Sequence, residues 1–179
     1  DVFFVFYVNE AYMNTGTQRS GLTPLGAKNS TTTAGKIQFP KDMPAIVEAH
    51  GIPYIATASP GYPGDLYDKV LKAHVTSGTR YMHINAPCPA GWQYPPGETV
   101  AMAKSAVETG AFILFEIEEG IFRLTGRSLA LAEKGKLLPV GEFFKYQGRF
   151  GKLDEDTLSR IQEQVNNRWR KAVERHNSN

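Results

Sequence analysis

The chain has 179 residues, of which 41% are hydrophobic and 21% charged, and these fractions are typical of a single globular domain with a sizeable core. The formal net charge is only +2 and no dense run of Lys or Arg occurs, which argues against a nucleic-acid-binding protein. No apolar run reaches the roughly 20 residues of a membrane-spanning helix. A single cysteine excludes an internal disulfide and is typical of a reducing cytoplasm.

The chain opens with an apolar run at residues 2–8 that predicts a parallel strand covered on both faces. A long polar segment, 9–40, follows it and is rich in Gly, Ser, Thr and Pro. Long connections inside compact domains are usually functional loops, and a disordered linker is the alternative. Small and amide side chains at a strand end can offer carbonyl oxygens and backbone N–H groups to a phosphorylated cofactor.

Helices and strands then alternate along the chain. The predicted elements are a helix at 42–50, a strand at 53–57, a helix at 65–77, a strand at 80–85, a helix at 97–108 and a strand at 111–117. In the helix at 65–77 we expect Asp65 to cap the N-terminus. The expected inward-facing residues of the two longer helices are Leu66, Val70, Leu71 and Ala73 in the first, and Val100, Ala103, Ala106 and Val107 in the second.

This alternation predicts an α/β fold with a mostly parallel sheet and helices on both faces, and ligands beyond the carboxyl ends of the strands. Residues 1–179 form one domain in this interpretation. Within it, 154–179 is a C-terminal amphipathic helix and tail, expected to dock on the core or on a partner subunit. The apolar positions at helical spacing are Leu158, Ile161, Val165, Trp169 and Val173.

Some titratable residues have ordinary structural explanations. The histidines, at positions 50, 74, 83 and 176, lack metal-ligand spacing and are expected to be structural. The carboxylates within 115–119 suit either a catalytic acid or a solvated strand end. Lys145, Arg149 and Lys152 could meet a coenzyme A phosphate or an acidic ferredoxin surface, or be ordinary surface charge.

Four stretches carry a resemblance to a known family. They are Asn9-Glu-Ala-Tyr-Met-Asn-Thr-Gly16 with Gln18-Arg-Ser20 and Thr23-Pro24 after it, Ala86-Pro-Cys-Pro-Ala-Gly-Trp92, the stretch from Glu108-Thr-Gly110 to Phe115-Glu-Ile-Glu118, and Gln147-Gly-Arg-Phe150. Together they resemble the C-terminal part of the thiamine-diphosphate-binding (beta) subunit of the 2-oxoacid:ferredoxin oxidoreductases, the pyruvate synthase family. The Gly-Asp-Gly turn that supplies the family's magnesium aspartate is missing from the sequence. We therefore expect the chain to begin within a subunit, with that aspartate and most cluster cysteines upstream.

The resemblance implies roles for the residues after the first strand. Asn9, through its side-chain oxygen, and Ala11, through its carbonyl, correspond to the family's magnesium ligands, and oxygen ligands are those that Mg²⁺ prefers. Asn9 could instead simply start a turn. Asn14 corresponds to the catalytic amide beside the cofactor, where it can stabilise a developing oxyanion. The remaining residues expected to bind the cofactor are Tyr12, Met13, Thr15 and Gly16. Glu10 receives no role.

Cys88 corresponds to the fourth ligand of the family's [4Fe-4S] cluster. A cubane cluster needs four ligands, so three would have to come from outside this chain. A buried, inert thiol is the alternative.

The function implied by the resemblance is a thiamine-dependent oxidative decarboxylation of a 2-oxoacid, with pyruvate as the leading substrate. Electrons would pass to an iron-sulfur cluster and ferredoxin, and the acyl group to coenzyme A, inside a heteromeric complex of anaerobic metabolism. Alternatives are a sister oxidoreductase for oxalate, a branched-chain oxoacid or an arylglyoxylate, and a non-catalytic α/β cofactor-binding module.

Overall fold

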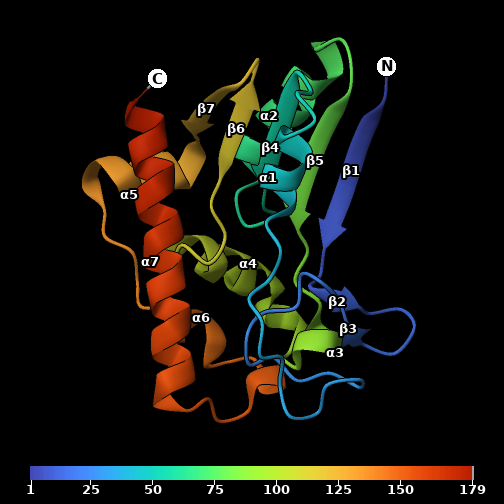
Figure 1. Ribbon diagram of the computed structural model, residues 1–179, viewed down its shortest axis with the longest axis vertical. Helices are drawn as coiled ribbons and strands as arrows, with labels where there is room; N and C mark the ends of the chain where they lie inside the picture. The colour runs from blue at the N-terminus through green and yellow to red at the C-terminus, as the bar shows by residue number, and fades with distance from the viewer. Residues whose placement is uncertain (179) are drawn as a thin grey trace.

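A five-stranded sheet organises the chain (Figure 1). The computed structural model describes residues 1–178, and the strands follow the order β1 (Phe3–Val8), β5 (Arg80–Asn85), β4 (Tyr54–Ala58), β6 (Phe115–Glu118) and β7 (Ile121–Leu124). β5 is parallel to both β1 and β4, whereas β6 is antiparallel to both β4 and β7. All strands except β6 therefore run in one direction, which confirms the predicted mostly parallel sheet.

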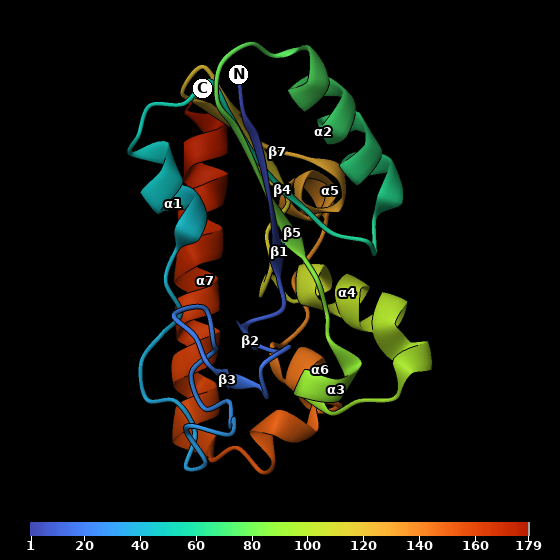
Figure 2. The same ribbon diagram turned by 90° about the vertical axis from the view of Figure 1, so that its right-hand side faces the viewer.

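Helices cover both faces of the sheet, also as predicted (Figure 2). On one face lie α1 (Met43–Glu48) and α7 (Glu155–Asn177), and on the other lie α2 (Pro63–Val75), α4 (Thr99–Glu108) and α5 (Gly126–Lys134). The shorter elements gather near the carboxyl ends of β1 and β5 (Figure 1). They are β2 (Ala11–Tyr12), β3 (Gln18–Arg19), α3 (Pro89–Trp92), η1 (Pro96–Glu98), α6 (Gly141–Phe144) and η2 (Gly148–Phe150). No helix among residues 1–178 combines the length and hydrophobicity needed to cross a bilayer.

The expectation that the first strand is covered on both faces is wrong. β1 lies at the edge of the sheet and pairs only with β5 among the described strands. Phe4 and Tyr7 point to opposite faces and are 56% and 68% exposed, and only Val8 is buried. An apolar run indicates a strand that suits apolar surroundings, but it cannot say whether the same chain provides them. An apolar edge of this kind can accept another polypeptide segment.

The fourth predicted strand begins later than expected and turns back on itself. β6 starts at Phe115, and β7 pairs with it across the two-residue turn Glu119-Gly120. Both turn residues have positive φ, +49° and +81°, as in the tight turns that suit the twist of a hairpin. The sequence analysis overlooked this hairpin, and it also missed α5 and α6.

The prediction for the helix at 65–77 is wrong about its cap and part of its inner face. α2 starts at Pro63 with Tyr62 at the N-cap position, so Asp65 lies in the first turn and pairs with Lys69. Of the expected inner residues, Val70 and Leu71 are exposed. Lys69 occupies the inner face because its ammonium group donates to the carbonyl of Thr57 and to Asp65, which satisfies a buried charge. In α4, Val100 was expected to face inward but is exposed. Met102, which was not among the expected inner residues, is buried instead.

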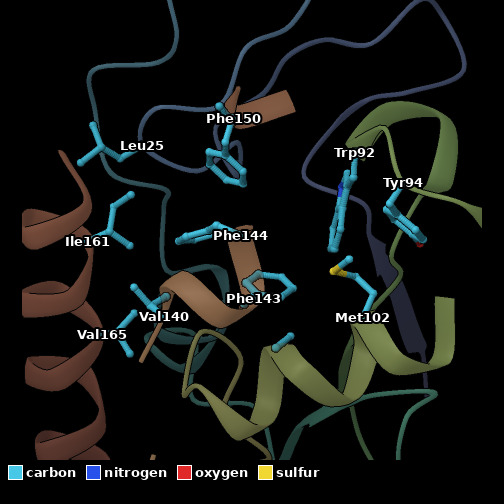
Figure 3. Close-up of a cluster of buried hydrophobic side chains, with 12 residues drawn as sticks. Leu25, Trp92, Tyr94, Met102, Val140, Phe143, Phe144, Phe150, Ile161 and Val165 are labelled. Carbon is cyan, nitrogen blue, oxygen red and sulfur yellow. The ribbon is translucent and has the colours of Figure 1, made fainter. Parts of the chain in front are cut away.

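The largest core cluster lies below the carboxyl ends of the strands and is rich in aromatic rings (Figure 3). Its buried members are Leu25, Ala27, Trp92, Tyr94, Met102, Ala106, Val140, Phe143, Phe144, Phe150, Ile161 and Val165. α7 contributes Ile161 and Val165 here, and Ala172 to a second cluster beside the sheet. The predicted docking of this amphipathic helix on the core is therefore confirmed. Asp154, the first residue of the expected range 154–179, caps the N-terminus of this helix. The last residue of that range, 179, lies outside the described residues.

Candidate functional site

Two polar loops leave neighbouring parallel strands side by side (Figure 1). In the β1–β5 register, Val8 lies opposite Asn85, and the backbone N–H of Ala86 donates to the carbonyl of Val8 at 2.9 Å. The loop that starts at Asn9 and the loop that carries Cys88 therefore begin at the same edge of the sheet. Juxtaposition at the carboxyl ends of parallel strands is the arrangement expected of a ligand site in an α/β fold.

The first loop folds into a small hairpin. β2 and β3 pair antiparallel, with Ala11 opposite Arg19 and Tyr12 opposite Gln18. At the tip, the N–H of Gly16 donates to the carbonyl of Met13 at 3.2 Å, and Gly16 has a φ of +117°, a conformation that favours glycine. The residues at the tip are exposed, so they are open to a ligand. The exposed residues are Tyr12, Asn14, Thr15 and Gly16.

Asn9 both starts the turn and keeps acceptor capacity. Its Oδ1 atom accepts a hydrogen bond from the N–H of Ala11 at 3.5 Å, the limit of a useful contact. Its carbonyl oxygen accepts from the indole Nε1 of Trp92 at 2.8 Å. The turn-starting interpretation and the ligand interpretation are therefore compatible, because a side-chain oxygen with one long hydrogen bond has a lone pair left.

The second loop places Cys88 against the first. Cys88 caps α3, and its half-buried Sγ atom accepts from the N–H of Gly91 at 3.4 Å. A Cβ atom on residue 91 would lie 2.0 Å from Sδ of Met13, so glycine here lets the Met13 side chain pack over the loop. Among residues 1–178, no group of three His, Cys, Asp or Glu side chains is placed to hold a metal ion.

Behind both loops lies Arg149, a residue whose role the sequence analysis misjudged. Its side chain is only 2% exposed, and its Nη2 atom donates to Oε2 of Glu10 at 2.5 Å. The guanidinium carbon lies 4.1 Å from the centroid of the Trp92 ring. Burial lowers the pKa of Arg149, and the nearby carboxylate of Glu10 counteracts that effect.

The interpretation of Lys145, Arg149 and Lys152 as one basic surface is therefore wrong for Arg149, whereas the exposed Lys145 and Lys152 fit the alternative of ordinary surface charge. Arg149 is buried and paired with Glu10, and Lys145 is exposed beside Glu142, to which it donates a hydrogen bond. Because the Arg149 guanidinium points into the protein, it is not accessible to a coenzyme A phosphate or an acidic protein surface.

Among the carboxylates of residues 115–119, Glu116 belongs to the scaffold, whereas Glu119 is exposed in the turn as a solvated strand end would be. Glu116 is buried and accepts hydrogen bonds from the hydroxyl of Tyr54 at 3.1 Å and from Nζ of Lys72 at 2.6 Å. Burial, followed by the charge of Glu116, raises the pKa of Tyr54. A solvated strand end is thus wrong for Glu116, which is held in an ion pair instead.

His83 has the structural role expected of it. Its Nδ1 atom lies 2.9 Å from the hydroxyl of Tyr81, and its ring stacks on Phe112. Burial lowers the pKa of His83 to about 4, so the ring is neutral near pH 7.

Asn85 is a candidate site residue that the sequence analysis did not single out. It is buried at the carboxyl end of β5, opposite Val8 in the register, and its Nδ2 atom has no hydrogen-bond acceptor among residues 1–178. Buried amide donors are usually paired, so such an atom is an indicator of a ligand site. The only sequence signal was its position as the last residue of a strand that ends in a polar loop.

Residues 1–85, which include the hairpin and its neighbouring strand, match the family described as the C-terminal TPP-binding domain of thiamine pyrophosphate enzymes. The matched segment, a little under half of the chain, therefore has the class of a thiamine-diphosphate-binding α/β domain.

Similar proteins of known name identify the family within this class. The chain is 46% identical over 170 residues to pyruvate synthase subunit PorB of Methanothermobacter thermautotrophicus, and the matched region covers 92% of this chain and 57% of the relative. It is 40% identical over 174 residues to ketoisovalerate oxidoreductase subunit VorB of Pyrococcus abyssi, with 94% and 55% covered. By sequence, the chain belongs to the family of these 2-oxoacid oxidoreductase subunits, and it spans a little over half of their length.

A solved structure is also similar at a lower level. The 2-oxoglutarate:ferredoxin oxidoreductase from Magnetococcus marinus shares 21% identity and a TM-score of 0.47, over 57% of this chain and 42% of that chain. This similarity is too low to support an inference about function.

Proposed function

We propose that this chain forms the diphosphate-binding part of a 2-oxoacid oxidoreductase that decarboxylates its substrate, pyruvate first among the candidates, with thiamine diphosphate. The observation that carries the proposal is the meeting of the Asn9–Gly16 hairpin and the Cys88 loop at the ends of β1 and β5. The 46% identity with a pyruvate synthase subunit supports it.

The residues of the hairpin fit a magnesium diphosphate group. Asn9 and Ala11 would offer Mg²⁺ a side-chain oxygen and a carbonyl oxygen, which are ligands of the right chemistry, and an aspartate from another segment would complete the set. Nδ2 of Asn85, a buried donor without an acceptor among residues 1–178, suits a neighbouring oxygen-rich group. The residues proposed to line the cofactor are Tyr12, Met13, Asn14, Thr15 and Gly16.

The chain's own contribution to the reaction is orientation and electrostatic stabilisation. When bound, thiamine diphosphate supplies the nucleophilic carbon and the electron sink that decarboxylation requires. Asn14, exposed at the hairpin tip, would donate its amide N–H to the substrate's carbonyl oxygen as that oxygen gains negative charge. None of the chain's own side chains is needed as a nucleophile.

Cys88 is proposed as the fourth ligand of a [4Fe-4S] cluster, with three ligands from outside this chain. The N–H of Gly91 donates to its sulfur, and hydrogen bonds to cluster sulfurs are one way that proteins set reduction potentials. The proposed partners are other subunits of the complex, ferredoxin as electron acceptor and coenzyme A as acyl acceptor. The proposed location is the cytoplasm, in line with the single cysteine.

The test is cofactor analysis of the intact complex, purified without oxygen. Native mass spectrometry and metal analysis would score thiamine diphosphate, magnesium, iron and acid-labile sulfide per copy of the chain. All four together support the proposal, and the C88S variant should then lose iron and sulfide but keep thiamine. If thiamine diphosphate is found without iron, Cys88 is a structural thiol and not a cluster ligand. If neither cofactor is found, the result favours a non-catalytic α/β module.

The substrate requires a separate measurement. The identities with PorB and VorB relatives, 46% and 40%, are close enough that a branched-chain oxoacid is a second candidate. Comparing kcat/KM of the complex for pyruvate, 3-methyl-2-oxobutanoate, oxalate and phenylglyoxylate would decide between them.

A further inference from the structure

We propose that Arg149 is a positioning residue that fixes the loop carrying Asn9 and Ala11, acting through Glu10 and Trp92. The inference rests on the proposed function, because its consequence is the affinity of that loop for a magnesium diphosphate group. Arg149 itself lies behind the loop and is not expected to touch the cofactor.

The first line of support is the conformation of Glu10. This residue has a φ of +66°, which costs free energy for a residue other than glycine and persists only when surrounding contacts hold it. Two contacts do so. The carbonyl of Glu10 accepts from Oγ1 of Thr23 at 2.6 Å, and its carboxylate accepts from Arg149 at 2.5 Å. Glu10 lies directly between Asn9 and Ala11, so its conformation sets the directions of both.

The second line of support is the Trp92 ring. Its indole N–H donates to the carbonyl of Asn9 at 2.8 Å, and its face lies 4.1 Å from the Arg149 guanidinium carbon. One cation therefore supports the loop twice, through the carboxylate of Glu10 and through the ring that holds Asn9. The same ring packs against Tyr94 and Phe143 in the core, which gives it a fixed position (Figure 3).

The third line of support is the way in which Arg149 is itself held. Its Nε atom donates to Oε1 of Gln147 at 2.9 Å, and its carbonyl oxygen accepts from the N–H of Lys28, farther along the 9–40 loop, at 2.8 Å. At Gly148, a Cβ atom would lie 2.9 Å from Cβ of Gln93 and 3.2 Å from its carbonyl oxygen. Glycine at this position allows the segment to approach the Cys88 loop closely. The Gln147-Gly-Arg-Phe150 motif thus packs against both site loops and supports them from the interior of the protein.

Arginine suits this role better than lysine. Its planar guanidinium can donate to Glu10 and Gln147 in the plane while its face rests on Trp92, and it remains charged when buried. A lysine ammonium has no flat face to stack and cannot reproduce both in-plane hydrogen bonds with the same geometry. Arg149→Lys is therefore expected to behave as a disruptive substitution.

The chain offers a matched control at a distance from the site. Arg175 of α7 donates two hydrogen bonds to Glu48 of α1 and lies over the ring of Phe122. This pair also joins distant segments through an arginine, a glutamate and an aromatic ring. Its ring, Phe122, is paired with Ile117 of β6, which lies opposite Ile55 near the start of β4 and so at the end of that strand away from the site. Arg175→Met should lower stability without affecting the loop.

The experiment uses the intact complex with its cofactor removed, and compares R149M, R149K, E10Q and R175M with the wild type. Affinity for thiamine diphosphate at fixed Mg²⁺ is measured by calorimetry, the thermal midpoint by scanning fluorimetry, and amide hydrogen exchange at residues 9–19 by mass spectrometry. We expect the two Arg149 variants to bind the cofactor about tenfold more weakly or worse, with faster exchange in the hairpin. R175M should lower the midpoint alone, and E10Q should follow R149K.

Equal loss of stability in R149M and R175M, with unchanged cofactor affinity and hairpin exchange, would overturn the inference and leave Arg149 as a structural ion pair. If R149M fails to assemble, R149K and E10Q, which keep most of the packing, decide the question by the same measurements. A wild-type complex without affinity for thiamine diphosphate would refute the proposed function instead. In that case, faster hairpin exchange in R149K would still support the positioning role.

Discussion

Arg149 and Lys69 are both buried cations, but their carboxylate partners lie at very different distances along the chain. Lys69 pairs with Asp65, one helical turn away in α2, and donates to the carbonyl of Thr57 in β4. Arg149 pairs with Glu10, which is 139 residues away. The first contact holds a helix on the sheet, whereas the second holds the loop between β1 and β2. Lys69 is therefore a buried charge of the scaffold, and Arg149 is a buried charge of the candidate site.

The largest effect on stability is expected from removing the scaffold charge. Lys69→Met leaves Asp65 buried without its cation, and breaking a buried ion pair costs about 3–5 kcal/mol. R149M should cost a similar amount. Cofactor affinity of the folded complex should fall only for R149M. Chemical denaturation of both variants measures the free energy of unfolding, and calorimetry measures the affinity for the cofactor. Weaker cofactor binding by K69M would show that Lys69 and Arg149 do not differ in their effect on the site.

Acid should weaken the scaffold through His83. Its folded-state pKa of about 4 lies below the usual value of 6.5, so the unfolded chain takes up a proton before the folded chain does. Its contribution to stability is complete above pH 6.5 and is lost as the pH falls toward 4. Between pH 7 and pH 5 the loss is about 2 kcal/mol. His83→Phe should flatten this part of the pH profile of unfolding, and an unchanged profile would show that His83 does not cause the loss.

Removing the indole hydrogen bond should have a smaller effect, confined to the site. Trp92→Phe keeps an aromatic ring beneath Arg149 but leaves the carbonyl of Asn9 without its donor. We expect cofactor affinity to fall roughly fivefold, equivalent to about 1 kcal/mol. Trp169→Phe, in α7, is the control for loss of ring size. The same affinity in both variants would show that the hydrogen bond does not position Asn9.

The smallest effect is expected from the second anchor of Glu10. Thr23→Val removes the hydroxyl that donates to the Glu10 carbonyl and should weaken cofactor binding by about 0.5 kcal/mol. Thr109 is a buried threonine whose hydroxyl donates to a carbonyl within α4, so Thr109→Val is the matched control. Isothermal titration of both variants makes the comparison, and an effect of Thr23→Val larger than that of R149K would assign the positioning role to Thr23.

The positions of the site loops could be predicted from the sequence. The strand expected at 80–85 coincides with β5, and its alternation with helices placed both polar loops at one edge of the sheet. Local signals suffice for this, because hydrophobic periodicity and chain direction are properties of short segments. The same signals did not reveal that β6 runs antiparallel, although Glu119-Gly120 between two apolar runs is a recognisable turn.

The sequence by itself determined the class of fold, the residues of the hairpin and the family resemblance, which depend on neighbours within a few positions. Only the tertiary structure decided which charges are buried, that β1 is an edge strand and that Arg149 meets Glu10 and Trp92. Burial and long-range pairing depend on how distant segments pack, and a charged side chain is indistinguishable in sequence whether its partner is solvent or a carboxylate 139 residues away.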